Sequence, residues 1–302
     1  MANLIERLEK RIRRHISESM PADQSYFEEQ TLVNLMIDYR VWRGRFVQPV
    51  PRTVRLSAEL KKSPKRQVHA AALAAIEAKI AAGEDLSAHL STRVSHPAGG
   101  NPTDPPSKRA DRDLLLAEWG VHHLHLSTEM RKDGFTKRTG DVLFVVFREA
   151  DAYLLGVFDH PQHENWAAEE IFAVMVRNWP DRGLVLKSDF VVGLSQEYSD
   201  EDRLELRKAG MNSALQIDGK VYSPGGSGMA LDGTPLIEVQ AAQQVMWELS
   251  RWEKDMARRL GEVVGVPRFA YWLPAVRTPV PGFEEYAGLA SGSAFVSVGR
   301  LR

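Results

Sequence analysis

The sequence predicts an α+β fold with a helical N-terminal region, a central antiparallel sheet flanked by helices, and a long C-terminal helix. Apolar residues recur at three- and four-residue steps through much of the first 90 residues, which is helical spacing. Three short runs rich in β-branched and aromatic residues lie between residues 121 and 158, which is typical of strands. A seam of apolar residues with helical spacing over 235–264 predicts the long helix.

Several N-terminal segments predict helices. Residues 3–16 and about 28–42 each carry one apolar stripe. Pro64 is suited to the first position of a helix, and Ala70–Ala82 is rich in good helix formers. Gly83 then supplies the stop signal, because glycine readily takes the left-handed conformation that ends a helix.

The middle of the chain changes from helical to strand-like periodicity. In order, we expect a short helix over 111–119, strands over 121–126, 142–148 and 153–158, and a helix over 166–179 that Pro180 ends. The segment Glu149–Ala152 is short enough to join the second and third strands as an antiparallel hairpin. The strands therefore predict a three-stranded meander with helices packed against it.

The C-terminal third carries two readable signals. Asp218-Gly219 lies between apolar residues of the segment 215–222, which predicts a β-hairpin. The long helix over 235–264 presents an apolar seam at 242–263, which predicts packing against the N-terminal helix or against a second copy of the chain in a homodimer. The structure of residues 265–302 cannot be predicted from the sequence.

Composition divides the chain into two expected domains. We expect a helical domain over 1–90, a linker over 91–108, and an α+β domain over 109–302 that contains the sheet (121–158) and the long helix. The linker is predicted because its eighteen residues hold four prolines and two glycines with little that is apolar.

Composition also excludes several classes of protein. The chain has no cysteine, which excludes disulfides, thiol nucleophiles and thiolate metal sites. No run of apolar residues approaches the roughly 20 that a membrane span needs, and the first residues lack the apolar core of a secretory signal. We therefore expect a cytoplasmic protein that does not associate with membranes.

One segment is strongly basic although the chain as a whole is balanced, with 39 Lys and Arg against 40 Asp and Glu. Between residues 40 and 66 a single acid, Glu59, accompanies nine bases: Arg40, Arg43, Arg45, Arg52, Arg55, Lys61, Lys62, Lys65 and Arg66. Trp42 and Phe46 lie among them, and cations interleaved with aromatic rings favour nucleic-acid binding. The alternative is solvation, or pairing with the acidic stretches 149–170 and 197–205.

Histidines gather in the predicted sheet. Five of the nine histidines fall in residues 122–163, where chance would place about one. Strand alternation puts His123 and His125 on one face and His122 on the other. His160 follows the third strand directly and could return to the same end of the sheet. The loop between the first two strands adds the cations Arg131, Lys132, Lys137 and Arg138.

Paired histidines beside cations favour RNA cleavage without a metal. One imidazole takes the proton of the 2′-hydroxyl, another protonates the leaving oxygen, and cations stabilise the charge on phosphorus. We predict His123 or His125 as general base and His160 as general acid, with interchangeable roles, and Lys137 and Arg138 as phosphate ligands. The RNA-binding set is predicted to be Arg40, Arg43, Arg45, Arg52, Arg55, Lys61, Lys62, Arg131 and Lys132.

These residues carry a resemblance to a known family. The runs Trp119–Leu126, Arg138–Phe147 and Ala152–His160 resemble the core sheet of RelE/ParE-like toxins, which belong to the superfamily of barnase, EndoU and colicin-type tRNases. The resemblance covers about 60 of the 302 residues. It implies an antiparallel sheet whose scattered side chains cleave RNA without a metal, a role as a toxin or defence effector, and an antitoxin or other protein partner.

Two alternatives remain open. His123, His125, His160 and His163 could instead bind zinc or manganese as the centre of a metal-dependent enzyme, since imidazole suits these metals. The protein could also bind nucleic acid or a partner without catalysis, in which case the histidines would be structural.

Overall fold

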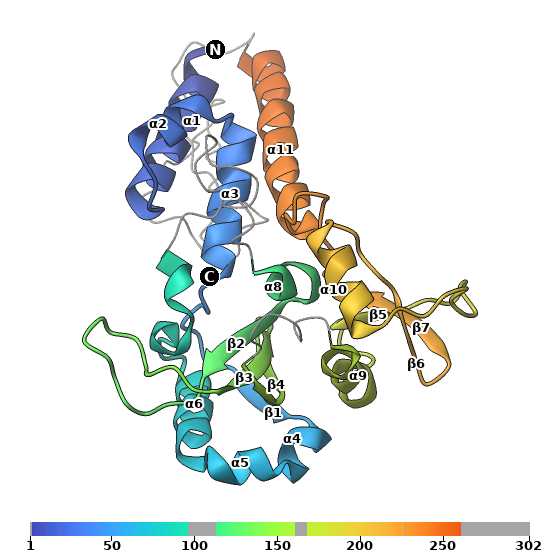
Figure 1. The fold of residues 1–302 in the computed structure, drawn as a ribbon. Coiled ribbons are helices and arrows are strands. Elements are labelled where there is room, and N and C mark those ends of the chain that lie inside the picture. Colours follow the sequence, from blue (N-terminus) through green and yellow to red (C-terminus); the bar gives the residue numbers. More distant parts are fainter. Residues whose placement is uncertain (1, 96–112, 161–167, 227, 261–302) are drawn as a thin grey trace, which may run out of the picture.

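The computed structural model describes residues 2–95, 113–160, 168–226 and 228–260 (Figure 1). Its helices are α1 (Ala2–Ser19), α2 (Gln24–Glu29), α3 (Leu32–Gly44), α4 (Ala58–Lys62), α5 (Pro64–Val68), α6 (Ala70–Ala82), the 3₁₀ turns η1 (Ser87–His89) and η2 (Thr92–Ser95), α8 (Leu114–Trp119), α9 (Glu169–Asn178), α10 (Asp200–Lys208) and α11 (Leu236–Leu260). Its strands are β1 (Thr53–Leu56), β2 (Val121–His125), β3 (Asp141–Phe147), β4 (Asp151–Asp159), β5 (Val185–Lys187), β6 (Leu215–Ile217) and β7 (Lys220–Pro224). The predicted α+β class is confirmed.

The central sheet has four strands in the order β1-β4-β3-β2. Strands β2, β3 and β4 form the predicted antiparallel meander, and the β3–β4 turn is the predicted hairpin. The sheet is nevertheless mixed, because β1 pairs with β4 in parallel, with Thr53 opposite Asp151 and Leu56 opposite Leu154. Strand β1 lies in the region expected to be all helical. It joins the sheet because Val54 and Leu56 pack into the core beneath the sheet.

Both faces of this sheet are buried. On one face, Val142, Phe144 and Val146 of β3 pack with residues of α8 and α9. On the opposite face, Leu143 and Val145 pack with residues of α6. Figure 1 shows α6 and α9 on opposite sides of the sheet. Because apolar side chains cover both faces, the two central strands, β3 and β4, are nearly continuous apolar runs.

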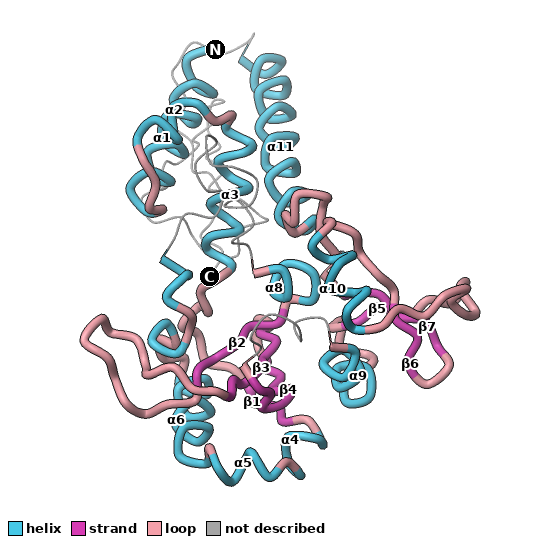
Figure 2. The backbone as a smooth tube through the Cα atoms, in the orientation of Figure 1, coloured by secondary structure: helices cyan, strands magenta, loops and turns pink. Residues whose placement is uncertain are grey.

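A second sheet of three strands, in the order β5-β7-β6, lies apart from the first (Figure 2). The predicted hairpin is confirmed, since Asp218 and Gly219 join β6 to β7 with φ of 50° and 74°. Two positive φ values in succession define the turn type that Asp-Gly favours. Strand β5 and helix α10 were not predicted from the sequence; α10 begins with a capping box between Ser199 and Asp202.

Helix α11 packs along the N-terminal helices. The buried residues of its seam, Ala242, Val245 and Leu249, share a core with α1 and α3 (Figure 1). An ion pair of 2.5 Å between Arg40 and Glu238 links α3 to α11. The N-terminal helices are thus one of the two expected partners of the seam, and the homodimer stays a prediction.

Some predicted boundaries shift. The helix expected over 28–42 is two helices, because Thr31 caps the start of α3 by accepting a hydrogen bond from the Asn34 backbone. As predicted, α5 begins at Pro64, and α6 ends directly before Gly83. Most of the predicted linker 91–108, all of 265–302 and the end of the long helix lie outside the described residues. None of the described helices is long and apolar enough to cross a membrane.

Candidate functional site

Three histidines meet at one end of the central sheet. The ring centroids of His123 and His125 are 6.3 Å apart, and that of His160 lies 6.3 Å from His123 and 5.5 Å from His125. His125 and His160 stack with an angle of 13° between their planes. His122 points to the other face, where it contacts Phe147 and its Nε2 lies 3.1 Å from the Gly44 carbonyl oxygen.

Strand register explains why these histidines converge. His125 is paired with Val142 near the start of β3, and the next residue of β3 outward, Asp141, is paired with Asp159 at the end of β4. The backbone N–H of His160 donates to the Gly140 carbonyl at 2.5 Å, which extends this ladder by one step. The C-terminal ends of β2 and β4 therefore lie at the same end of the sheet, on either side of the start of β3.

Asp113 completes the cluster, and it was not predicted as a site residue. Its Oδ2 lies 3.3 Å from Nδ1 of His123, while its Oδ1 accepts the backbone N–H of Leu116 as the cap of α8. The chain reverses at Gly120, which has φ of 69°. Six helical residues rise about 9 Å, and three strand steps from this turn cover about 10 Å. The cap of α8 is therefore level with His123.

Sequence signals identify Asp113 only as a helix cap. An aspartate directly before a short apolar helix is a standard start signal. Its proximity to His123 depends on how α8 folds back on β2. Burial raises the pKa of the Asp113 carboxyl, but the imidazole of His123 and the backbone N–H of Leu116 together outweigh burial, so the pKa lies below its usual value.

Two of the three imidazoles, those of His125 and His160, have lowered pKa values. Burial, together with the nearby imidazoles of His123 and His160 and the guanidinium of Arg138, lowers the pKa of His125 to about 4. Burial, His123 and Arg138 likewise lower the pKa of His160. His125 is only 3% exposed, whereas His160 is partly exposed. At neutral pH the imidazoles of both His125 and His160 are therefore neutral, and each has a ring nitrogen that can accept a proton.

The cationic loop brings one of its residues into electrostatic contact with the histidines. The charge of Arg138 lowers the pKa of both His125 and His160, and its guanidinium donates to the Thr92 hydroxyl at 3.4 Å. Lys137 instead pairs with Glu129 at 3.2 Å. Arg131 pairs with Asp133 at 2.6 Å and Lys132 is exposed, so these two lie in the outer part of the loop.

Arginines of the basic segment make contacts within the protein. Besides Arg40 with Glu238, Arg55 pairs with Asp151 at 2.6 Å, which is the pairing with the acidic stretch 149–170 that was the alternative interpretation. Arg45 and Arg52 donate to backbone carbonyls at 3.1 and 2.7 Å, and Arg43 donates to the Gln48 amide at 3.3 Å. Lys61 and Lys62 on α4 are exposed.

A second polar network lies at the same end of the sheet, and it too was not predicted. Lys65 Nζ is 2.7 Å from a carboxylate oxygen of both Asp141 and Asp159. His69 Nε2 is 2.8 Å from the other oxygen of Asp141. Since Asp159 directly precedes His160, this network ties α5 to the strand end that carries the histidine cluster.

The metal alternative concerns the same histidines. His163, one of its four predicted ligands, lies outside the described residues. Within the described ranges, no group of three or more His, Asp or Glu side chains is placed to hold a metal ion. Zinc or manganese binding therefore stays a prediction.

Comparisons with protein-family models, curated proteins and solved structures give no match to this chain. The similarity to RelE/ParE-like toxins remains a resemblance, and a functional hypothesis has to rest on the geometry of the site.

Proposed function

We propose that the protein is a metal-independent endoribonuclease acting on cytoplasmic RNA. The observation that carries the proposal is the contact of three imidazoles at one sheet end, one beside the carboxylate of Asp113 and two with lowered pKa values. This arrangement supplies a proton donor and a proton acceptor side by side, which is the requirement of acid–base cleavage.

The chemistry assigns distinct roles to the histidines. His160 is partly exposed and takes the proton of the 2′-hydroxyl as the general base. The 2′-oxygen then bonds to phosphorus, and the bond from phosphorus to the 5′-oxygen breaks. His123 gives its proton to that 5′-oxygen as the general acid, because a carboxylate beside an imidazole stabilises the positive charge of a proton-holding ring. The products are a 2′,3′-cyclic phosphate and a 5′-hydroxyl.

His125 and Arg138 have supporting roles in this scheme. His125 is buried and stacks on His160, so it acts as a positioning residue. Arg138 is exposed and electrostatically coupled to His160, so its guanidinium binds the phosphate and stabilises the charge that develops on it. Lys137 has an exposed ion pair with Glu129 and is the weaker candidate of the two predicted phosphate ligands.

The test is cleavage of purified RNA in EDTA by the wild-type protein and by His160→Ala, Asp113→Asn and Lys220→Ala. Loss of a general base costs about 10²–10⁴-fold in rate, so His160→Ala should lose cleavage. Asp113→Asn should lose most of it. Lys220 is an exposed residue of the second sheet, so Lys220→Ala should match the wild type. Circular dichroism establishes that each variant is folded.

Parallel reactions separate the alternatives. Cleavage that requires added zinc or manganese would replace this proposal with the metal-dependent one. RNA binding without cleavage in any condition would favour a non-catalytic binding protein. DNA that is cut as readily as RNA would contradict a mechanism that uses the 2′-hydroxyl.

The resemblance to RelE/ParE-like toxins extends the proposal to a biological role. A toxin or defence effector of this kind is held inactive by an antitoxin or similar partner. Expression of the wild-type chain alone should therefore slow bacterial growth, and expression of the His160→Ala variant should not. Equal growth with both chains would contradict the toxin role while leaving the RNA assay to decide the activity.

A further inference from the structure

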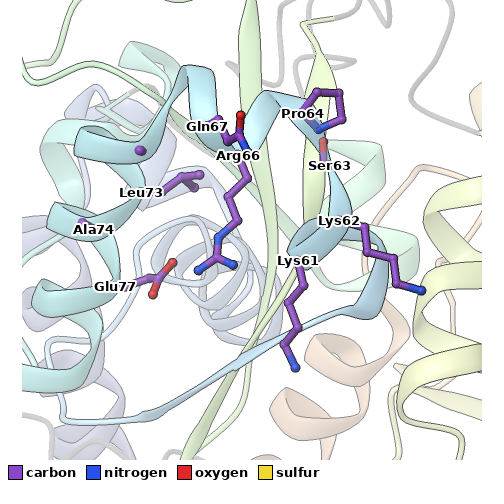
Figure 3. Close-up of a pocket in the computed structure, with 10 residues that line it drawn as sticks. Lys61, Lys62, Ser63, Pro64, Arg66, Gln67, Leu73, Ala74 and Glu77 are labelled. Carbon is purple, nitrogen blue, oxygen red and sulfur yellow. The ribbon is translucent and has the colours of Figure 1, made fainter.

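A hollow of about 540 Å³ lies between α4, α5 and α6 (Figure 3). Its size is within the range of roughly 300–1,000 Å³ that small-ligand sites occupy. Residues that line it include Lys61, Lys62, Arg66, Gln67, Leu73 and Glu77. In Figure 3, Arg66 and Glu77 extend toward the same space from α5 and α6, Lys61 lies on the same side, and Lys62 turns outward.

The cations of this hollow make no polar contact with other side chains in the described part of the structure. Among the described residues, the side chains of Lys61, Lys62 and Arg66 have no ion pair and no hydrogen bond. Lys65 in the same turn of α5 differs, because it pairs with both Asp141 and Asp159. Three cations against the single carboxylate of Glu77 leave an excess of two positive charges, and this local field attracts anions.

The rest of the lining suits a nucleotide better than a bare anion. Leu73 is buried beneath the hollow, and Ala70 and Ala74 extend this apolar surface along α6. A flat base can lie on aliphatic side chains, while the amide of Gln67 can hydrogen-bond to the edge of any base. Cations at one side and an apolar floor at the other match the phosphate and the base of one unpaired nucleotide.

The hollow is linked to the histidine cluster through α5. Lys65 reaches from α5 to Asp159, and His160 is the next residue of the chain. The imidazoles lie on the face of the sheet that α8 covers, and the hollow lies beside α6 on the opposite face. A strand of RNA that occupies both sites therefore has to pass over the end of the sheet.

We propose that this hollow is a subsite for single-stranded RNA, which holds one nucleotide of the strand that is cleaved. Its phosphate lies on Lys61 and Arg66, and Lys62 adds positive charge at the outer side of the hollow. This inference rests on the proposed ribonuclease function for its substrate, since the geometry by itself defines a site for a nucleotide phosphate. The subsite supplies binding and register rather than proton transfer.

The test measures the affinity of a fluorescent single-stranded RNA of mixed sequence by anisotropy, in the His160→Ala background so that the RNA is not cut. Lys61→Ala/Lys62→Ala/Arg66→Ala should weaken binding at least about tenfold at physiological salt. Since each neutralised phosphate on a single strand contributes about 0.7 to the slope of log K against log salt, and these cations hold one phosphate, the slope should decrease by about 0.7. The matched control is Lys187→Ala/Lys208→Ala/Lys220→Ala, which removes three exposed cations near the second sheet. It should change the affinity less than threefold.

Each outcome decides the proposal. Selective weakening by the variant of the hollow supports it, and equal affinity of the two triple variants overturns it. No measurable RNA binding by the His160→Ala parent also overturns it. If the mononucleotide 5′-AMP binds the hollow and RNA does not, the hollow is a site for a free nucleotide and not an RNA subsite. If binding depends on the hollow but the wild-type protein never cuts RNA, the ribonuclease function fails and the RNA subsite stands as a binding site.

Discussion

Protonation of His125 should make the protein lose stability in mild acid. Its side chain is 3% exposed and its pKa is lowered from 6.5 to about 4, so the folded protein resists a proton that the unfolded chain accepts. The stability from its neutral form is fully present above pH 6.5 and is lost as the pH falls toward 4. The gap between the two pKa values corresponds to about 3 kcal/mol in all, and about 2 kcal/mol of this is lost between pH 7.5 and pH 5.0.

Urea unfolding at these two pH values tests this magnitude. We compare the wild-type protein with His125→Asn and His125→Phe, neither of which titrates at this position. The decrease in the free energy of unfolding from pH 7.5 to pH 5.0 should be about 2 kcal/mol smaller in the variants. The pKa of His122 is also lowered to about 4, chiefly by burial. Because His122 is present in all three proteins, its contribution to the pH dependence cancels in the comparison. The same decrease in wild type and variants would refute the reasoning.

Three further substitutions test the packing of the fold, each by urea unfolding. Glu118→Ala should cost about 3–5 kcal/mol, because it leaves the guanidinium of Arg207 buried without its ion-pair partner; a loss below 1 kcal/mol would show that water reaches this pair. Gly83→Ala should cost at least about 1–2 kcal/mol, because φ is 73° and the added Cβ would lie 2.5 Å from a backbone nitrogen; an unchanged midpoint would contradict that conformation. Ser57→Ala removes both the cap of α4 and a 2.6 Å hydrogen bond to the Leu155 carbonyl, so it should cost about 1–3 kcal/mol. In contrast, Ser17→Ala removes a solvent-exposed hydrogen bond to the Arg14 carbonyl within α1 and should change stability by less than about 0.5 kcal/mol.

Elements with strong local signals were predictable from the sequence. The strands β3 and β4 are mainly apolar runs with clear ends, and α6 is a run of helix formers before a glycine. The hairpin at Asp218-Gly219 needs only two residues that accept positive φ. In each case the determining interactions lie within a few neighbouring residues.

Elements stabilised by distant contacts were not predictable. The segment of β1 is four residues long and gains its strand conformation from pairing with β4, about a hundred residues later. Strand β5 is three residues long and depends in the same way on β7. Strands of this length carry too few side chains for periodicity to be visible.

The candidate site shows the same division. Strand alternation was enough to place His123 and His125 on one face, and the chain order suggested that His160 would join them. The approach of Asp113 required the reversal of the chain at Gly120, which the sequence marks only as a helix end. The contacts of the basic arginines likewise depend on tertiary packing, so composition alone suggested a more accessible surface than the fold leaves.

The chemical ends of the cleaved RNA test the central claim most directly. Wild-type protein is incubated with a defined single-stranded RNA in EDTA, and the products are analysed by mass spectrometry. Attack by the 2′-hydroxyl, with proton transfer by His160 and His123, predicts a 2′,3′-cyclic phosphate on one fragment and a 5′-hydroxyl on the other. Products with a 3′-hydroxyl and a 5′-phosphate, or an RNA that stays intact, would contradict the account.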